Sequence, residues 1–292
     1  MLSKFYQQKI YNKLSDDILK KNIEAIMKNN YDLIELEPVS PGGTLGIFFR
    51  ATTTSGTFFI KTHQTGERAY NNLCNEIEIL QHLYGDELHI RGFNIFSEQN
   101  AHAVLVMDQL STLTNLPSKV EISTLVTTYQ KKLETTESDI KQKLYQFDEL
   151  LELATQALEV LPKAGLLQKT LASRIDEVLF PLRKEKPSCL CHGDLSNKNV
   201  MEKNGKLYVI DWEDTVWGIP DYDVCYWMTF FDQRKYYDED FFSELKIDGK
   251  RGKMLMVLSV LLKCFLSYHN NNYHDNKLSF DERIEEILQL NS

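Results

Sequence analysis

Disulfide pairs, basic clusters and long apolar runs are the features that this 292-residue chain lacks or has little of. Its five cysteines are an odd number without a CxxC pair, so we expect reduced thiols in a cytoplasmic protein and no disulfide framework or zinc site. Acidic residues (42) outnumber basic ones (33), and the formal net charge of −9 argues against a nucleic-acid partner.

Signals for a membrane are also weak. The opening residues, MLSKFYQQKIYNKL, are polar and lack the apolar centre of a secretory signal, so we expect none. The longest apolar run, 254–268, is too short to cross a bilayer and contains Lys263, which indicates a buried helix. We therefore expect no membrane span.

The first third of the chain is rich in strand-like segments. Residues 15–30 predict a helix with Ser15 as its N-cap. Beyond it, aromatic and β-branched residues predict strands, with one amphipathic helix among them. The strands are expected at 31–39, 47–53, 57–63 and 103–107, and the helix at 67–83.

Beyond about Leu110 the patterns are mainly helical, with an apolar stripe over 139–161. We therefore expect an α+β protein with two domains. The first, 1–110, would include a helical extension at 1–30, and the second would span 111–292.

One strong β signal falls inside the helical part, in the stretch HGDLSNKNVMEKNGKLYVIDWED (192–214). Asn204-Gly205 is a strong hairpin signal, because a type I′ turn needs positive φ at both central residues. A two-residue loop places Lys203 opposite Lys206.

This register brings Asn199 and Asp211 within one residue of each other across the ladder. Regular pairing would point their side chains to opposite faces, so a shared ion requires a bend at the strand end. Amide and carboxylate oxygens suit Mg²⁺, and Asp194 could accept a proton from a hydroxyl. A polar loop that merely closes the hairpin is the alternative interpretation.

The stretch resembles the HxDxxxxN motif, followed by the metal-binding Asp, of the kinase-like fold. In its longer form, HGDLSNKNV followed by VIDWEDTVWGIPDYDV, it resembles the aminoglycoside phosphotransferase and choline kinase family, with Gly218, Pro220 and Asp223 at the later motif positions. The resemblance implies a bilobal, protein-kinase-like fold with a small β-rich nucleotide-binding lobe and a larger, mainly helical catalytic lobe. It also implies ATP, with GTP left open, and Mg²⁺.

The resemblance assigns roles to residues of both parts. Asn199 and Asp211 would bind Mg²⁺, and Asp194 would orient the acceptor hydroxyl or accept its proton. Lys61 matches the strand lysine that contacts the nucleotide phosphates, and Glu76 the helix glutamate that pairs with it.

Further residues of the nucleotide site follow from the same resemblance. In SPGGTLG, Gly43 and Thr44 would lie in the phosphate loop. The segment from Met107 to Leu110 falls where the hinge would contact adenine, with Asp108 and Leu110 as candidates. Among other residues, Glu78 is the alternative to Glu76, and His192 and Asp223 are expected to be structural.

A small-molecule hydroxyl is the expected acceptor. Twelve positions separate Asp211 from Asp223, too few for a peptide-docking segment, and Ser196 stands where protein kinases usually carry a lysine. Aromatic and acidic residues in 227–245 could bind a cationic amino alcohol or aminoglycoside, or could form an amphipathic helix with an acidic face. Sugars stay open as acceptors, and so does the oligomeric state.

A catalytically silent nucleotide-binding regulator of the same fold is the competing prediction, and a scaffold protein is a third. The presence of all five motif residues, Lys61, Glu76, Asp194, Asn199 and Asp211, favours a phosphotransferase. A scaffold would bind no nucleotide.

Overall fold

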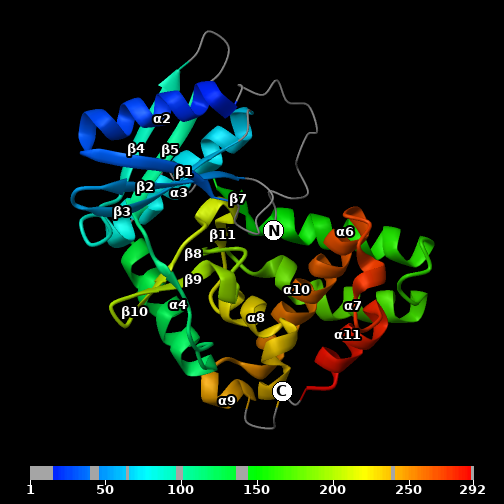
Figure 1. Ribbon diagram of the computed structural model, residues 1–292. Helices are drawn as coiled ribbons and strands as arrows, with labels where there is room; N and C mark the ends of the chain where they lie inside the picture. Colours follow the sequence, from blue (N-terminus) through cyan, green and yellow to red (C-terminus); the bar gives the residue numbers. More distant parts are fainter. Residues whose placement is uncertain are drawn as a thin grey trace. The chain divides into compact units, whose positions relative to one another are not determined.

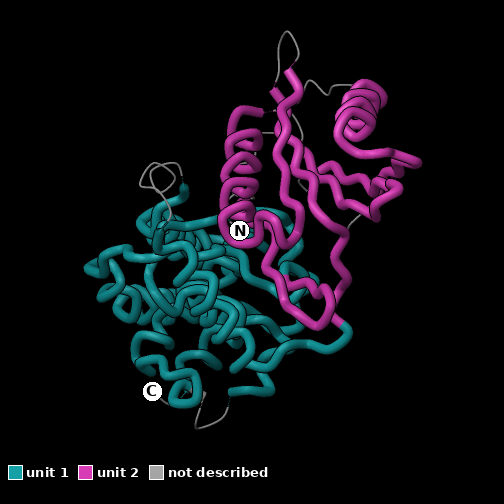
Figure 2. The backbone as a smooth tube through the Cα atoms, turned by 90° about the vertical axis from the view of Figure 1, so that its left-hand side faces the viewer, with its two compact units in different colours: residues 1–7, 114–199, 214–292 teal, residues 8–113, 200–213 magenta. Residues whose placement is uncertain are grey.

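The computed structural model describes residues 16–39, 46–63, 66–96, 101–135, 144–237 and 241–290 (Figure 1). These residues form two compact units (Figure 2). The sheet unit contains the described residues of 8–113 together with 200–213. The helical unit contains those of 114–199 and 214–292.

A five-stranded antiparallel sheet forms the centre of the sheet unit, in the order β1-β2-β3-β5-β4. Its strands are β1 (Leu33–Val39), β2 (Gly46–Thr53), β3 (Gly56–His63), β4 (Arg91–Phe96) and β5 (Ala101–Asp108). Four of them lie where aromatic and β-branched residues predict strands. Strand β4, RGFNIF, was not predicted, because Gly92 and Asn94 are residues that strands disfavour.

Helix α2 (Asp16–Asn30) covers one face of this sheet (Figure 1). Leu19, Ile23 and Met27 follow one another at four-residue steps and are almost completely buried. The sheet residues that share their core are Leu36, Phe49, Ala51, Phe58, Ile60, Ile95, Val104 and Val106. Burying each of the three helix side chains contributes about 2 kcal/mol, so α2 is an integral part of the unit. Ser15, the predicted N-cap, lies outside the described residues.

Helix α3 (Glu67–Tyr84) packs against β3, β4 and β5, as predicted for 67–83. Successive residues of a strand point to opposite faces of a sheet. Because Ile60 points into the core beneath α2, its neighbour Lys61 points to the opposite face. Strand β3 therefore carries its lysine away from α2.

The predicted hairpin is present, within a second sheet of three strands. The strands are β6 (Ser111–Thr112), β9 (Val200–Lys203) and β10 (Lys206–Val209), in the order β10-β9-β6. Lys203 pairs with Lys206 as expected, and Asn204 and Gly205 have φ values of 52° and 77°. The predicted division at residue 110 places this hairpin in the second domain, whereas its contacts group 200–213 with the sheet unit.

The helical unit is built around helix α10 (Gly249–His269), which packs against α6, α7, α8 and α11. The other helices are α4 (Lys119–Leu133), α6 (Phe147–Lys163), α7 (Lys169–Leu179), α8 (Tyr222–Met228), α9 (Phe241–Leu245) and α11 (Phe280–Leu288). Strands β7 (Tyr145–Gln146), β8 (Cys189–Cys191) and β11 (Val216–Gly218) form a small sheet, in the order β7-β11-β8.

Helix α6 begins later than the apolar stripe over 139–161 indicated. The amide of Gln146 donates to Glu149 Oε1 at 2.9 Å in a capping box, which starts the helix at Phe147. Hydrophobic periodicity continued across this boundary because Leu144 and Tyr145 are also buried, but in non-helical backbone.

The apolar run predicted as a buried helix lies in α10, and this prediction is confirmed. Among the described helices, α10 is long and apolar enough to cross a membrane, but 67% of its apolar window is buried inside the protein. Every residue from Met254 to Leu262 is buried, so the helix is apolar on all sides because protein surrounds it. The predicted α+β fold class is likewise confirmed.

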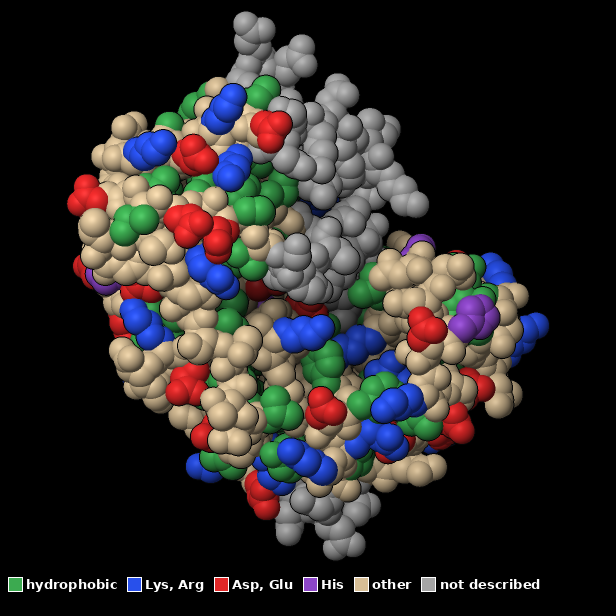
Figure 3. Space-filling view, in the orientation of Figure 1, with side chains coloured by type: hydrophobic (Ala, Val, Ile, Leu, Met, Phe, Trp, Pro, Cys, Tyr) green, Lys and Arg blue, Asp and Glu red, His purple; other side chains and the backbone are tan. Residues whose placement is uncertain are grey.

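The charged side chains have mixed signs on the face seen in Figure 3. Lys and Arg side chains are interspersed there with Asp and Glu, and hydrophobic side chains lie between them. Both signs of charge are thus present on the described part of this face.

Candidate active site

Lys61, near the end of β3, is the centre of a buried cluster of charges. Its Nζ donates hydrogen bonds to Glu76 Oε2 at 2.7 Å and to Asp211 Oδ1 at 2.5 Å. Glu213 Oε2 lies 3.6 Å from the same nitrogen, and 6% of the Lys61 side chain is exposed. Three residues predicted from the sequence thus meet at one point, within the sheet unit. Glu78, the alternative to Glu76, is exposed.

The charges of this cluster depend on one another. Burial alone would lower the pKa of Lys61, but the carboxylates of Asp211, Glu213 and Glu76 together raise this pKa well above its ordinary value. Burial also raises the pKa of Glu76, and the Lys61 ammonium opposes this effect. Lys61 therefore stays protonated and neutralises part of the surrounding negative charge.

Asp211 has the bent backbone that the hairpin geometry required. Its φ is 68°, in the left-handed region that non-glycine residues rarely adopt. The next residue, Trp212, is completely buried, and its Nε1 donates to the carbonyl of Val209 at 2.9 Å. The tryptophan thus anchors the turn that directs the Asp211 carboxylate to Lys61.

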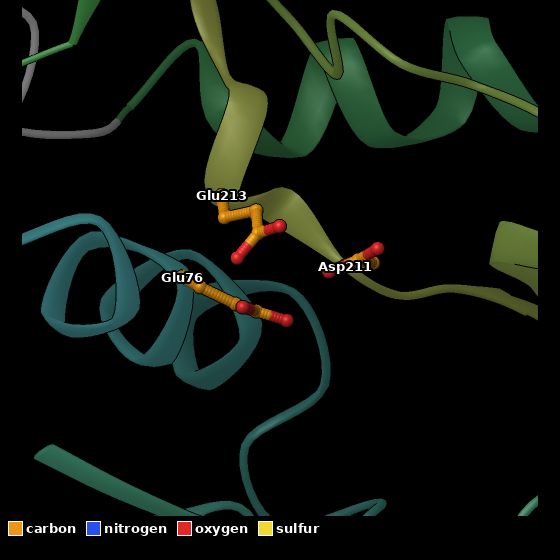
Figure 4. Close-up of side chains that lie close together, drawn as sticks. All are labelled: Glu76, Asp211 and Glu213. Carbon is orange, nitrogen blue, oxygen red and sulfur yellow. The ribbon is translucent and has the colours of Figure 1, made fainter. Parts of the chain in front are cut away.

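Glu213 is a residue of this cluster that the sequence reasoning did not assign. Figure 4 shows the Glu76 side chain reaching from α3 toward Asp211 and Glu213, which both follow strand β10. The motif IDWED contains the signal, because a second acid stands two residues after Asp211. In extended backbone the side chains of Asp211 and Glu213 would point to one face. The bend at Asp211 interrupts this alternation, so the spacing of the two acids alone does not place Glu213 in the cluster.

The hairpin that carries Asp211 is fixed to the end of helix α3 by residues that the sequence did not single out. The Tyr84 hydroxyl accepts a hydrogen bond from the Val209 amide at 3.1 Å. Glu87 accepts hydrogen bonds from Tyr208 Oη, at 2.7 Å, and from Lys206 Nζ. Because Glu76 lies on the same helix, these contacts hold the two halves of the cluster together.

The carboxylates of this cluster fit a hard divalent cation. Glu76, Asp211 and Glu213 each offer an oxygen, and the three oxygens lie within 4.8 Å of one another. Mg²⁺ prefers oxygen ligands and retains waters and phosphate oxygens in its shell. Asp211 has 41% of its side chain exposed, so it is the member most open to an incoming ion.

Asn199, the other predicted metal ligand, lies in the helical unit and is held by its own loop. Its Nδ2 donates to the carbonyl of Asp194 at 2.9 Å, and its backbone amide donates to the carbonyl of Ser196 at 3.0 Å. The side-chain nitrogen makes this hydrogen bond, so the Oδ1 atom is the ligand that Asn199 would offer to a cation.

The loop that carries Asp194 is organised by Asp223 of helix α8. The Asp223 carboxylate is completely buried and accepts hydrogen bonds from the amides of His192, at 2.8 Å, and Gly193, at 3.1 Å. Tyr129 Oη adds a third, at 2.5 Å. Burial raises the pKa of Asp223, and these donors oppose that shift. The buried His192 and the hydrogen bonds of Asp223 agree with the structural roles predicted for both residues.

Asp194 itself is half-buried. Its Oδ1 accepts a hydrogen bond from the hydroxyl of Tyr226, which also belongs to α8. Tyr226 is a second residue near the site that the sequence reasoning did not assign.

The predicted hinge residues have side chains that are engaged elsewhere. Asp108 points to the face opposite Lys61, where its carboxylate contacts His89 Nδ1 at 2.9 Å and Lys203 Nζ at 2.5 Å. Leu110 is buried. A hinge contact with adenine would therefore use backbone groups. Gly43 and Thr44 lie outside the described residues.

A cavity of about 310 Å³ opens on this same side, beside Tyr31, His89, Arg91 and Asp108. Because strand residues alternate between faces, the cavity lies away from the Lys61 face. It is thus separate from the charge cluster.

A sequence model of the phosphotransferase enzyme family matches residues 35–252. This range contains Lys61, Glu76, Asp194, Asn199 and Asp211. No curated protein sequence matches the chain.

Several solved structures share the fold. The aminoglycoside phosphotransferase APH(4)-Ia, in a ternary complex with ADP and hygromycin B, has a TM-score of 0.62 and 17% identity over 92% of this chain and 98% of its own. For the choline kinase LicA from Streptococcus pneumoniae the TM-score is 0.54, with 15% identity over 93% and 98%. Spectinomycin phosphotransferase APH(9)-Ia, with ADP and spectinomycin, has a TM-score of 0.55 and 16% identity over 92% of both chains. At these identities the likeness shows the fold alone.

Proposed function

The chain belongs to the phosphotransferase enzyme family, and we propose that it transfers the γ-phosphate of ATP to a hydroxyl group of a small molecule. One observation carries the proposal: Lys61 is buried between the carboxylates of Glu76 and Asp211, with Glu213 beside them. Burying so many charges is costly. The need to bind phosphates and a metal ion would account for this concentration of buried charges.

Phosphoryl transfer requires mainly positioning and neutralisation of charge. Lys61 would bind the phosphates, and Glu76 would hold Lys61 in place. Asn199 and Asp211 would bind Mg²⁺, with Glu213 as a further oxygen ligand. A bound Mg²⁺ would supply positive charge that neutralises the phosphates. Asp194 would orient the acceptor hydroxyl and accept its proton.

Residues 227–245 were expected either to bind a cationic acceptor molecule or to form one amphipathic helix. It is divided instead between the end of α8, a 3₁₀ helix at Phe231–Tyr236, and α9. Three aromatic rings of the segment face cations of the same chain. Lys263 Nζ lies 3.3 Å from the ring centroid of Phe230, and Arg283 Cζ lies 5.0 Å from that of Phe231. Lys119 Nζ lies 5.7 Å from the ring centroid of Tyr236.

Two acidic side chains in or near this segment, Glu244 and Glu286, are paired within the chain. Glu244 accepts from Lys119 at 2.6 Å, and Glu286 from Arg234 at 2.5 Å. Asp238, Glu239 and Asp240 lie outside the described residues. Rings and carboxylates that already hold internal cations are poorly suited to a cationic ligand. We therefore favour a neutral hydroxyl compound, such as a sugar, over an aminoglycoside or an amino alcohol.

The nucleotide and the compartment are part of the same proposal. ADP in the solved structures of APH(4)-Ia and APH(9)-Ia supports ATP as the donor, with GTP as the alternative to test. None of the five cysteines, all of which are described, forms a disulfide, which agrees with a reducing cytoplasm.

An acceptor panel tests the proposal. The purified chain is mixed with Mg²⁺ and ATP or GTP and with neutral sugars, amino alcohols or aminoglycosides, and products are identified by mass, with Asp194→Asn as the control. Transfer to a neutral acceptor that is lost in Asp194→Asn is expected. Transfer to cationic acceptors alone would overturn the preferred acceptor class. Nucleotide binding without any transfer would support the silent regulator.

A further inference from the structure

Helix α8 contacts the Asp194 loop through three side chains. Asp223 accepts hydrogen bonds from the loop backbone, as described above, and Trp227 Nε1 donates to Asn197 Oδ1 at 2.8 Å. The third contact is made by Tyr226, which is 3% exposed and whose hydroxyl donates to the Asp194 carboxylate. Of the three, this contact alone reaches the side chain proposed to act on the acceptor.

The ring of Tyr226 is itself held on several sides. Lys263 of helix α10 places its Nζ 3.9 Å from the ring centroid. The same ammonium donates to the Tyr226 carbonyl at 3.2 Å and to Thr229 Oγ1 at 2.7 Å. Phe230 meets the ring edge-on, with centroids 5.7 Å apart. A tyrosine packed in this way has little freedom to change rotamer.

The direction of the hydrogen bond follows from the chemistry of the two groups. Burial and the Asp194 carboxylate raise the pKa of Tyr226 well above its ordinary value, so the hydroxyl keeps its proton at neutral pH. A hydroxyl that donates to a charged carboxylate makes a strong hydrogen bond. A carboxylate has two acceptor oxygens, so a bond at Oδ1 does not prevent an acceptor hydroxyl from donating to the group.

We propose that Tyr226 is a positioning residue for Asp194: its hydroxyl fixes the carboxylate in one rotamer, and Lys263 fixes Tyr226. This inference rests on the proposed function, because it gives Asp194 the role of orienting the acceptor. Pre-orienting that carboxylate reduces the freedom that must be lost when the acceptor binds. Tyr226 should thus affect turnover more than nucleotide binding.

A matched control lies one helical turn away. Tyr222 of the same helix is completely buried, and its hydroxyl has no hydrogen-bond partner among the described residues. Tyr222→Phe removes a buried hydroxyl from the same helix, and no hydrogen bond joins that hydroxyl to Asp194. A general effect of removing a buried hydroxyl from α8 would appear in both variants.

The kinetic test compares Tyr226→Phe and Tyr222→Phe with the unmodified chain, using Mg²⁺-ATP and the acceptor identified by the panel. We expect Tyr226→Phe to lower kcat about tenfold, as for the loss of one hydrogen bond to a charged group, with an unchanged KM for ATP. Tyr222→Phe should retain full turnover. Unchanged kcat in Tyr226→Phe, or an equal loss in both variants, would overturn the proposal.

A stability cycle tests the contact without any acceptor. Urea midpoints are measured for Tyr226→Phe, Asp194→Ala and the double variant. The proposal predicts that Tyr226→Phe shifts the midpoint less in the Asp194→Ala background, because the partner is already absent. Equal shifts in both backgrounds would refute the contact. A chain that phosphorylates no acceptor would count against the proposed function, and this cycle would still decide the role of Tyr226.

Discussion

Gly193 lies so close to Asp214 that a Cβ atom on the glycine would be 2.0 Å from the Asp214 carbonyl oxygen. Its φ of 81° is also in the left-handed region. Both constraints act on the residue that precedes Asp194. The glycine of the HGD motif is therefore required by the backbone path, before any chemistry is considered.

Gly193→Ala is expected to lower the free energy of unfolding by about 3 kcal/mol, because the new methyl group meets rigid backbone. Gly165→Ala is the matched control: its φ is also positive, at 72°, but a Cβ there meets nothing within 4 Å. It should cost about 1 kcal/mol. Urea unfolding measures both, and equal losses would contradict the steric account.

The hairpin shows what sequence alone could predict. Asn204-Gly205 fixed the pairing of Lys203 with Lys206, because a two-residue turn leaves no other register. The need for a bend followed from the alternation of strand residues. Which residue at the strand end would bend did not follow, because no local pattern singles out Asp211 for the left-handed conformation that it adopts.

Contacts between residues far apart in the chain needed the family resemblance or were missed. Lys61 and Asp211 are separated by 150 positions, and no local pattern joins them. The pairing of Lys61 with Glu76 was expected from the resemblance, which the family match now confirms, whereas the direct contact of Lys61 with Asp211 was not predicted. The resemblance assigned no role to Tyr226, and its hydrogen bond to Asp194 depends on how α8 packs beneath the loop.

Lys61→Met is expected to destabilise the sheet unit by about 3 kcal/mol, because it leaves the buried Glu76 carboxylate without its cation. Adding Glu76→Gln should recover part of this loss, since the remaining buried group is then neutral. Thermal unfolding of the single and double variants measures the effect. A double variant less stable than Lys61→Met would show that the uncompensated charge of Glu76 is not the cause.

Glu213→Gln tests whether the acid two residues after Asp211 takes part in metal binding. If Glu213 offers an oxygen to Mg²⁺, the Mg²⁺ concentration needed for half-maximal turnover should rise about tenfold. Glu202→Gln, on the hairpin strand β9, serves as a control outside the cluster. An unchanged Mg²⁺ requirement in Glu213→Gln would restrict its role to pairing with Lys61.

The measurement that most directly tests the account is the turnover of Mg²⁺-ATP and an acceptor by Asp194→Asn. The account predicts a fall in kcat of about a thousandfold, the effect of removing a general base, with an ATP affinity close to that of the unmodified chain. Turnover that survives in Asp194→Asn would remove Asp194 from the mechanism and contradict the proposed arrangement of the site.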